Sequence, residues 1–242
     1  MRQDHAVVSP QEWLEARKTL LALEKEHTHA RDKVNAARLA LPWVKMEKTY
    51  VFDTVTGRKS LSELFDGRSQ LIVYHFMFGP TWEAGCPGCS FLVDHFAGML
   101  PHLNHHDVTL IAASNAPLAK IEAYRKRMDW HFPWVSAEGN GFNHDYHVAF
   151  SPDELASGKV AYNFTEIESA NAHEELPGLS AFQKGEDGAI YHTYSSYARG
   201  LEELVGTLML LDRAPKGRNK DHTMSFVRRH DEYEKVRGRK AG

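Results

Sequence analysis

Residues 71–89 read Leu71-Ile72-Val73-Tyr74-His75-Phe76-Met77-Phe78-Gly79-Pro80-Thr81-Trp82-Glu83-Ala84-Gly85-Cys86-Pro87-Gly88-Cys89. The run from Leu71 to Phe78 is nearly continuously apolar, which is typical of a strand buried on both faces of a sheet. From Cys89 to Leu103, apolar residues recur at helical spacing, and Pro101 is expected to kink or end that helix. The two cysteines are therefore predicted to lie between a buried strand and the start of a helix.

This placement gives the two cysteines different chemistry. Pro87 suits the first helical position, so Cys86 is predicted at the N-cap, where free backbone N–H groups and the positive end of the helix dipole face its sulfur. These groups favour the thiolate and lower its pKa below about 8.5, the value for a free thiol. Cys89 follows one helical turn later, within reach of a disulfide. We predict that Cys86 attacks a substrate and that Cys89 resolves the mixed disulfide.

Strands and helices alternate in the sequence after the dithiol. This alternation favours an α/β fold with a parallel sheet and helices on its faces. Residues 137–176 are less regular and are expected to be an insertion with a helix or two. The other expected elements are a strand at 107–113, a helix at 114–128, a strand at 132–135, a hairpin of strands at 179–184 and 189–194, and a helix at about 201–212.

An N-terminal helical extension, residues 1–45, is expected before the main domain at 46–212. Ser9 and Glu12 form a predicted capping box, and amphipathic spacing continues to about Leu39. The helix is expected to pack on the domain or on a second subunit, as a homodimer, although a charged helix face is usually solvated.

The C-terminal residues 213–242 form a tail that is rich in Lys and Arg. A nucleic-acid-binding arm is conceivable, but a solvated tail that partly docks on the domain is the favoured interpretation. The side chains that would dock are Met224, Phe226, Val227 and Tyr233. The net charge of −3 implies no global attraction to nucleic acid or to an anionic membrane.

Length and composition suit one large domain with an added helical segment. The chain has 242 residues, of which 42% are hydrophobic and 25% charged, which is ordinary for a globular protein. No apolar run approaches the roughly 20 residues that span a bilayer, and residues 1–10 contain no apolar segment of a secretory signal. The expectation is a cytoplasmic protein without a membrane partner. Because the chain has two cysteines, close together, a secreted disulfide scaffold is disfavoured.

Two alternatives to a catalytic dithiol stay open. A metal site needs two further ligands from His, Asp or Glu, and His144 and His147 have the spacing of one helix face. The cysteines could also be a structural, inert pair. The sequence has no Gly-x-Gly-x-x-Gly motif and no phosphate loop. No cofactor is therefore expected, and electrons would come from an external thiol donor.

The chain resembles the thioredoxin-like superfamily and, more closely, the DUF899 family of thioredoxin-like proteins. The resemblance rests on Tyr-His-Phe-Met-Phe-Gly-Pro at 74–80, on Trp82 with Gly-Cys-Pro-Gly-Cys-Ser-Phe at 85–91, on Tyr-Ala-Arg-Gly at 197–200 and on residues 228–233. It spans nearly the whole chain. It implies a thioredoxin-like fold, a central mixed sheet flanked by helices, with an added N-terminal helix and a basic C-terminal extension.

Three positions depart from the patterns of better-known relatives. Thioredoxins place a Trp directly before the first cysteine, whereas Trp82 lies four residues before Cys86. Leu179 stands where thioredoxins carry a cis-proline before the hairpin, with Pro177 two residues earlier. Glu83 stands where peroxiredoxins carry Thr or Ser. General protein-disulfide reduction and typical peroxidase chemistry are therefore less favoured.

The sequence predicts a thiol–disulfide oxidoreductase that uses Cys86 and Cys89, with a disulfide substrate or a thiol donor as its partner. A non-catalytic binding or assembly protein on the same scaffold and a metal-binding sensor are the alternatives. The candidates for supporting roles are Trp82 as a lid over the dithiol or part of the core, Glu83 as a proton shuttle or an exposed loop residue, Pro87 in the first helical turn, and Arg199 as a contact for the thiolate or an anionic substrate.

Overall fold

The computed structural model describes residues 5–218 and 224–234 of the chain. Residues 1–4, 219–223 and 235–242 lie outside this part, so the expected basic tail, 213–242, is described at 213–218 and 224–234. The chain divides into two compact units, Met1–Pro42 and Trp43–Gly242.

The first unit contains one long helix, α1 (Pro10–Leu39), of 30 residues. It begins with the predicted capping box, because the Ser9 side chain accepts a hydrogen bond from the backbone N–H of Glu12 and the Glu12 carboxylate accepts one from the backbone N–H of Ser9. None of the described residues of α1 is buried. The helix therefore covers no core of its own, and its apolar side chains are exposed within this unit.

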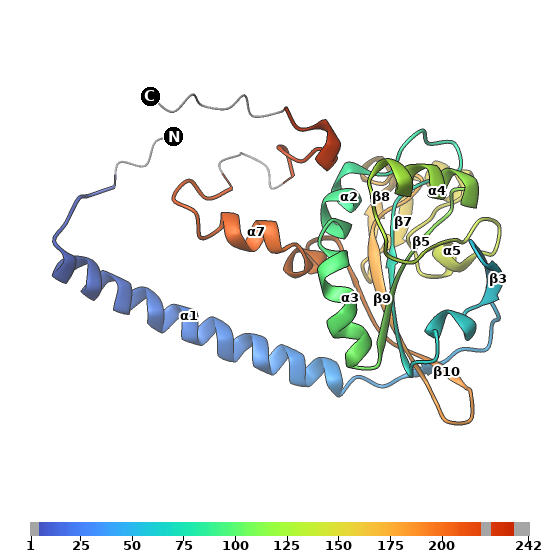
Figure 1. Ribbon diagram of the computed structural model, residues 1–242, viewed down its shortest axis with the longest axis horizontal. Helices are drawn as coiled ribbons and strands as arrows, with labels where there is room; N and C mark the ends of the chain where they lie inside the picture. Colours follow the sequence, from blue (N-terminus) through green and yellow to red (C-terminus); the bar gives the residue numbers. More distant parts are fainter. Residues whose placement is uncertain (1–4, 219–223, 235–242) are drawn as a thin grey trace. The chain divides into compact units, whose positions relative to one another are not determined.

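The second unit is built on a mixed sheet (Figure 1). Within the described residues, eight strands form it in the order β1-β10-β9-β4-β5-β6-β2-β3. Strands β4, β5 and β6 run parallel, whereas β9 pairs antiparallel with β4, and β10 antiparallel with β9. The strands are β1 (Val44–Lys45), β2 (Val51–Thr54), β3 (Gly57–Ser60), β4 (Gln70–His75), β5 (Val108–Ser114), β6 (Trp134–Ser136), β9 (Gly178–Lys184) and β10 (Ile190–Tyr197).

Helices connect the strands and lie against the sheet (Figure 1). The chain runs β4-α2-α3-β5-α4-β6, then through the insertion to the hairpin β9-β10, and then to η3 and α7. A parallel βαβ unit joined to an antiparallel hairpin on the other side of β4 is the arrangement of the thioredoxin-like fold, so the predicted fold class is confirmed. The helices are η1 (Glu63–Phe65), α2 (Pro87–Val93), α3 (Phe96–His105), α4 (Leu118–Arg127), α5 (Phe142–Asp145), α6 (Pro152–Ala156), η2 (Ser169–Asn171), η3 (Ala198–Leu204), α7 (Gly206–Leu211) and η4 (His230–Glu232).

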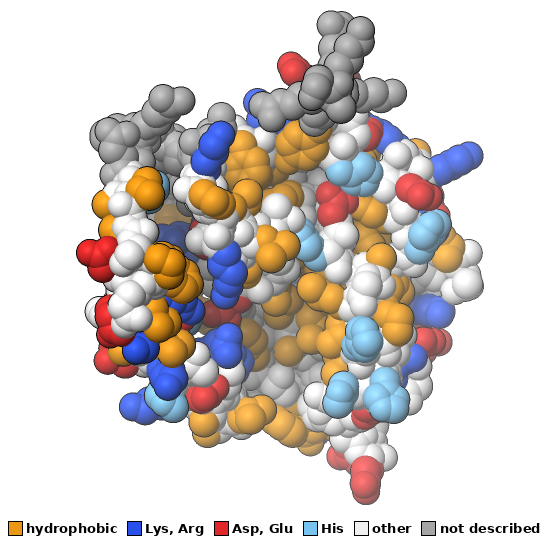
Figure 2. Space-filling view, turned by 60° about the vertical axis from the view of Figure 1, so that its left-hand side comes forward, with side chains coloured by type: hydrophobic (Ala, Val, Ile, Leu, Met, Phe, Trp, Pro, Cys, Tyr) orange, Lys and Arg blue, Asp and Glu red, His pale blue; other side chains and the backbone are white. Residues whose placement is uncertain are grey.

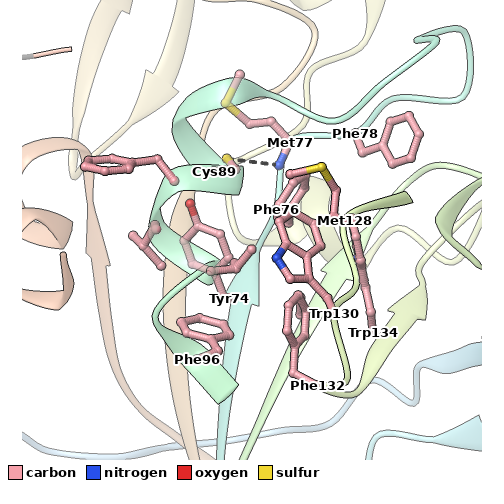
Figure 3. Close-up of a cluster of buried hydrophobic side chains, with 14 of the residues drawn as sticks. Tyr74, Phe76, Met77, Phe78, Cys89, Phe96, Met128, Trp130, Phe132 and Trp134 are labelled. Atoms are coloured by element: carbon pink, nitrogen blue, oxygen red, sulfur yellow. Dashed lines mark hydrogen bonds between the residues drawn. The ribbon is translucent and has the colours of Figure 1, made fainter. Parts of the chain in front are cut away.

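Strand β4 divides the core into two layers, because its side chains alternate between the faces of the sheet. Tyr74 and Phe76 belong to the cluster that includes residues of α2, α3, α4 and α7, part of which is drawn in Figure 3. Leu71 and Val73 belong to the cluster on the other face, with β2, η1 and α5. The apolar run therefore forms a strand that is buried on both faces, as its composition predicts.

Two helices follow the dithiol, instead of the single helix that the sequence predicts. Helix α2 ends at Val93, α3 begins at Phe96, and α3 continues through Pro101 instead of ending there. At the break, Asp94 accepts a hydrogen bond from Trp130 Nε1 at 2.8 Å, and His95 Nε2 lies 2.9 Å from Thr207 Oγ1. The two residues at the break thus form side-chain hydrogen bonds to segments that are distant in the chain. The local sequence pattern does not predict these bonds.

Two further elements differ from the sequence prediction. The insertion contains, besides α5 and α6, a hairpin of β7 (Lys159–Tyr162) and β8 (Thr165–Glu168). Its turn residues, Asn163 and Phe164, both have positive φ. The helix expected at 201–212 is a 3-10 segment, η3, followed by the short helix α7.

The view in Figure 2 shows exposed side chains of both signs of charge. On the face drawn in Figure 2, hydrophobic side chains are exposed between charged ones, and acidic and basic residues are interspersed. Among the described residues, no helix is both long enough and apolar enough to cross a membrane.

Candidate functional site

The two cysteines lie where β4 leads into α2. Cys86 is the N-cap residue of α2, Pro87 occupies the first helical turn, and the backbone N–H of Cys86 donates to the carbonyl oxygen of Met77 at 3.0 Å. Cys89 is buried one turn further on, and its sulfur accepts the backbone N–H of Met77 at 3.4 Å (Figure 3). The cysteines lie 4.0 Å apart as free thiols. The dithiol is therefore held on both sides by Met77, in the segment directly after β4.

The surroundings separate the acidities of the two thiols. The pKa of Cys86 is lowered to about 6, first by a hydrogen bond from the Cys89 thiol and then by the backbone N–H groups of Cys89 and Gly88 and the charge of Arg229, against the effect of burial. Burial, followed by the neighbouring Cys86, raises the pKa of Cys89 well above its ordinary value. The thiolate is thus favoured at Cys86 and the protonated thiol at Cys89.

Tyr74, in β4, lies beneath the dithiol. Its ring is buried, and its hydroxyl points towards Cys89 in Figure 3. Burial and the neighbouring Cys89 sulfur raise the pKa of Tyr74 well above its ordinary value. The phenol therefore stays neutral and can donate a hydrogen bond to Cys89 once that residue becomes a thiolate. The apolar run in the sequence does not indicate this role, because a tyrosine in such a run is most often part of the core.

The C-terminal segment 224–234 packs beside the cysteines. Val227 is 6% exposed and belongs to the first core cluster. Arg229 donates from Nε and Nη2 to the carbonyl oxygen of Gly85, at 3.0 and 2.7 Å. At Gly85 a Cβ atom would lie 2.6 Å from the ring of Phe76, so glycine permits this close approach. The segment thus brings a guanidinium group to the residue directly before Cys86.

Ion pairs hold the same segment to the helical layer. Arg127 of α4 pairs with Asp231 at 2.7 Å, and His230 Nδ1 lies 2.7 Å from a carboxylate oxygen of Asp94. The hydrogen bond from Arg127 holds the pKa of Asp231 below its usual range. These contacts join the segment to α4 and to the loop between α2 and α3.

The residues expected to dock the tail take different positions. Val227 is buried, and the Phe226 ring lies edge-on to Phe91 with the ring centroids 5.9 Å apart. Met224 and Tyr233 are each 43% exposed. Met224 nevertheless lines the pocket next to the dithiol. The tail therefore contributes to the site as well as to the core.

An apolar pocket of about 310 Å³ opens beside the two cysteines. Pro177 lines it and directly precedes β9, which begins at Gly178. The strand expected at 179–184 begins one residue earlier, so Leu179, the position aligned with the thioredoxin cis-proline, lies inside β9 and Pro177 directly before it; none of the described peptide bonds is cis. The other apolar and aromatic lining residues are Tyr74, Met77, Leu92, Ala198, Leu201, Val205, Leu208 and Met224.

The expected supporting residues are placed as follows. Pro87 is in the first turn of α2. The Trp82 indole packs on the first core cluster and donates to Glu174 at 3.3 Å, and Trp82 does not line the dithiol pocket. Glu83 is exposed on the loop. Arg199 lies at the pocket, 85% exposed in its side chain, and pairs with Glu202 at 3.0 Å. Of these four residues, Arg199 is thus the one whose largely exposed side chain lines the pocket.

A metal site at His144 and His147 has no support in the geometry. Helix α5 ends at Asp145, and His147 has a φ of 55°, so the two imidazoles do not share a helix face. His144 Nε2 instead lies 3.0 Å from a carboxylate oxygen of Glu154. Among the described residues, no group of three or more His, Cys, Asp or Glu side chains is placed to hold a metal ion.

Comparison with solved structures finds distant likeness to peroxiredoxins. The peroxidoxin BcpB of Mycobacterium tuberculosis is 13% identical, with a TM-score of 0.43, over 70% of this chain and 97% of that one. Peroxiredoxin Q of Xanthomonas campestris, in one of its structures, is 11% identical, with a TM-score of 0.40, over 66% and 89% of the two chains. The mitochondrial 2-Cys peroxiredoxin of Plasmodium falciparum is 10% identical, with a TM-score of 0.39, over 71% and 94%.

No curated protein matches the sequence. A family model does, and it covers residues 2–233. Its description is "Bacterial protein of unknown function (DUF899)", which agrees with the resemblance drawn from the sequence. The chain belongs to the DUF899 family.

Proposed function

We propose that the protein is a thiol–disulfide oxidoreductase with Cys86 as the nucleophile and Cys89 as the resolving thiol. The observation that carries the proposal is the placement of the two thiols, with Cys86 at the N-cap of α2 and Cys89 buried 4.0 Å away; in this placement the pKa of Cys86 is lowered and that of Cys89 raised. A thiolate with a lowered pKa is available for attack near neutral pH, while a protonated neighbour cannot compete with it.

The reaction proceeds in two exchanges. The Cys86 thiolate attacks one sulfur of a substrate disulfide, which forms a mixed disulfide and releases the other half of the substrate as a thiolate. Cys89 then loses its proton and attacks Cys86 Sγ, which breaks the mixed disulfide and releases the second half. The substrate gains two electrons and takes up protons, and the protein is left with a Cys86–Cys89 disulfide. An external thiol donor returns the electrons.

The pocket beside the cysteines suggests the character of the substrate. Its wall is formed mainly by aliphatic and methionine side chains, with Arg199 and Glu202 paired beside them. Burial of an apolar group there is favourable by about 25 cal/mol per Å². We therefore expect a small disulfide with alkyl groups to react faster than one that carries two carboxylates per half.

The first test is the pH dependence of alkylation of Cys86 by iodoacetamide, read by mass spectrometry. In the variant Cys89→Ser, the serine hydroxyl can still donate to the Cys86 sulfur, and the expected apparent pKa is about 6. In Cys89→Ala this donor is lost, and the pKa is expected to rise towards about 8.5. The reduction potential of the wild-type dithiol is measured by equilibration in glutathione buffers.

Two results together would contradict the proposal. One is an apparent pKa near 8.5 in Cys89→Ser, and the other is a dithiol that forms no disulfide in an oxidising glutathione buffer. The binding or assembly protein and the metal sensor would then take its place, and the metal content of the purified protein would separate them.

A further inference from the structure

A second cavity, of about 560 Å³, lies next to the dithiol region. The segment 174–177 contributes to both spaces, because Glu174 and Glu175 line this cavity and Pro177 lines the dithiol pocket. The proposed thiol chemistry makes no use of the side chains that line this cavity, but the charge of Cys86 contributes to the raised pKa of Glu175.

Glu175 is the unusual residue of the cavity wall. It is 4% exposed, and its Oε1 atom has no hydrogen-bond partner among the described residues. Burial raises the pKa of Glu175 to about 7, with smaller contributions from the charges of Glu174 and Cys86, against the lowering effect of the backbone N–H of Phe78 and the side chain of Asn115. A buried carboxylate oxygen without a hydrogen-bond donor costs free energy, so a donor supplied to it from the cavity would be favourable.

A chain of buried and half-buried side chains leads to Glu175. His75 Nδ1 lies 2.9 Å from Asn143 Oδ1, and Asn143 Nδ2 donates to Asn115 Oδ1 at 3.2 Å. Asn115 therefore has its amide N–H groups left for Glu175. Burial lowers the pKa of His75 to about 4, so its ring is neutral and carries one N–H for Asn143. From His75 to Asn115, each side chain donates in the direction of the carboxylate. The carboxylate is therefore the acceptor at the end of this chain, and a ligand bound to it would have to be a donor.

The rest of the wall combines acidic and apolar side chains with Asn115 and His144, whose Nε2 lies 3.0 Å from a carboxylate oxygen of Glu154. Glu138 and Glu174 line the cavity beside Glu175, and among the described residues that line it there is no Lys or Arg. The apolar part of the wall includes Phe150 and Leu155. This combination favours a positively charged group attached to an apolar body.

We propose that this cavity binds a small organic cation, an ammonium or guanidinium group on an apolar body, with the charged group on Glu175. The ligand supplies the hydrogen-bond donor that Glu175 Oε1 lacks, and its apolar body covers Phe150 and Leu155. The cation compensates the negative charge of Glu175, and a hydrogen bond between charged partners is stronger than one between neutral groups.

Calorimetric titration with four probes of matched size tests the proposal on the full-length protein. The probes are n-butylammonium, n-butylguanidinium, n-butanol and n-butyrate. The cations are expected to bind at least tenfold more tightly than the alcohol, and butyrate is expected not to bind. Equal affinity for the alcohol and the cations, or binding of butyrate, would overturn the proposal, as would no detectable binding of either cation at millimolar concentration.

Three variants locate the binding. Glu175→Gln keeps the shape but removes the charge, and it is expected to weaken cation binding at least tenfold. Ala149→Leu leaves the carboxylate in place and fills part of the cavity, and it is expected to weaken binding similarly. Glu47→Gln removes an exposed carboxylate that does not line the cavity, and affinity should stay within twofold of the wild type. Unchanged affinity in both cavity variants would place the cation elsewhere and refute the site.

Discussion

Cys86 and Cys89 differ in the groups that surround each sulfur, although one helical turn separates them. Cys86 is met by N–H groups, by a thiol donor and by a guanidinium charge, whereas Cys89 is enclosed by apolar side chains and Tyr74. The effect of the helix start on Cys86 can be predicted from the sequence, because the position of Pro87 determines it. The contact between Arg229 and Gly85 cannot be predicted from sequence spacing, because the two residues lie far apart in the chain.

Arg229 is expected to act on Cys86 both by charge and by position. In Arg229→Gln the charge is lost, so the pKa of Cys86 is expected to rise, by less than about one unit because the charge is one of several contributions. Arg229→Lys keeps the charge and is expected to show a smaller rise. The measurement is the pH profile of alkylation in the Cys89→Ser background.

Arg228 provides the matched control for this series. It is exposed, and its guanidinium donates to the carbonyl oxygen of Val227. Arg228→Gln changes the net charge by the same amount but is expected to leave the profile unchanged. An equal shift in both glutamine variants would mean that general electrostatics, and not the contact with Gly85, lowers the pKa.

Glu175 is expected to make stability depend on pH. Its pKa is raised from 4.5 to about 7 by burial, so the folded protein holds the proton more tightly than the unfolded chain. The stabilisation is complete below about pH 4.5 and is lost as the pH rises through about 7, and it amounts to about 3 kcal/mol at 1.36 kcal/mol per unit. In Glu175→Gln this loss is absent. The free energy of unfolding in urea, variant minus wild type, is therefore expected to increase from pH 4.5 to pH 8.

The comparison between the two proteins removes the titration of groups that do not interact with Glu175; Glu174 and Cys86 do interact with it. A difference that stays constant across this pH range would show that Glu175 titrates normally. The same variant then serves both measurements, because loss of cation binding with a gain in stability at pH 8 distinguishes a lost ligand contact from a damaged fold.

The loop and helix that carry the dithiol illustrate which elements local sequence can predict. The strand β4, the N-cap at Cys86 and the start of α2 follow from apolar runs and from Pro87, which act over a few residues. The break at Asp94 and His95 depends on Trp130 and Thr207, which are distant in the chain. The same limit applies to Glu175, whose significance depends on a cavity that several segments form together.

Gly85 is expected to be essential to the shape of the loop before α2. In Gly85→Ala the new Cβ would lie 2.6 Å from Phe76 and 2.8 Å from Tyr124, and both rings are packed in the core. Overpacking of this kind costs about 1–3 kcal/mol. Gly98→Ala in α3 is the control, since its Cβ would meet nothing, and it is expected to stabilise by up to about 1 kcal/mol. Urea unfolding measures the stability of both variants. Equal changes in their free energy of unfolding would rule out the clash.

At the scale of the whole molecule, the proposed chemistry in the second unit gives no role to helix α1. None of the described residues of α1 is buried. The side chains of Trp13, Leu20, Leu23 and Val34 are 59%, 50%, 59% and 53% exposed. Position by position, these side chains follow the heptad pattern of a coiled coil. The first core position repeats at Trp13, Leu20, His27 and Val34, and the second at Ala16, Leu23, Ala30 and Ala37.

We predict that α1 pairs with α1 of a second copy of the chain as a two-stranded coiled coil. Light scattering of the full-length protein is expected to give twice the chain mass of 27.5 kDa. Leu20→Asp with Leu23→Asp places charges in the seam and is expected to give the monomer mass, because unpaired charges cannot be buried there. Leu39→Asp is the control, since Leu39 is 87% exposed and lies outside the heptad core, and it should leave the dimer intact. If the double variant stays dimeric, the second unit holds the dimer together; if the wild type is a monomer, α1 has no partner in a second copy.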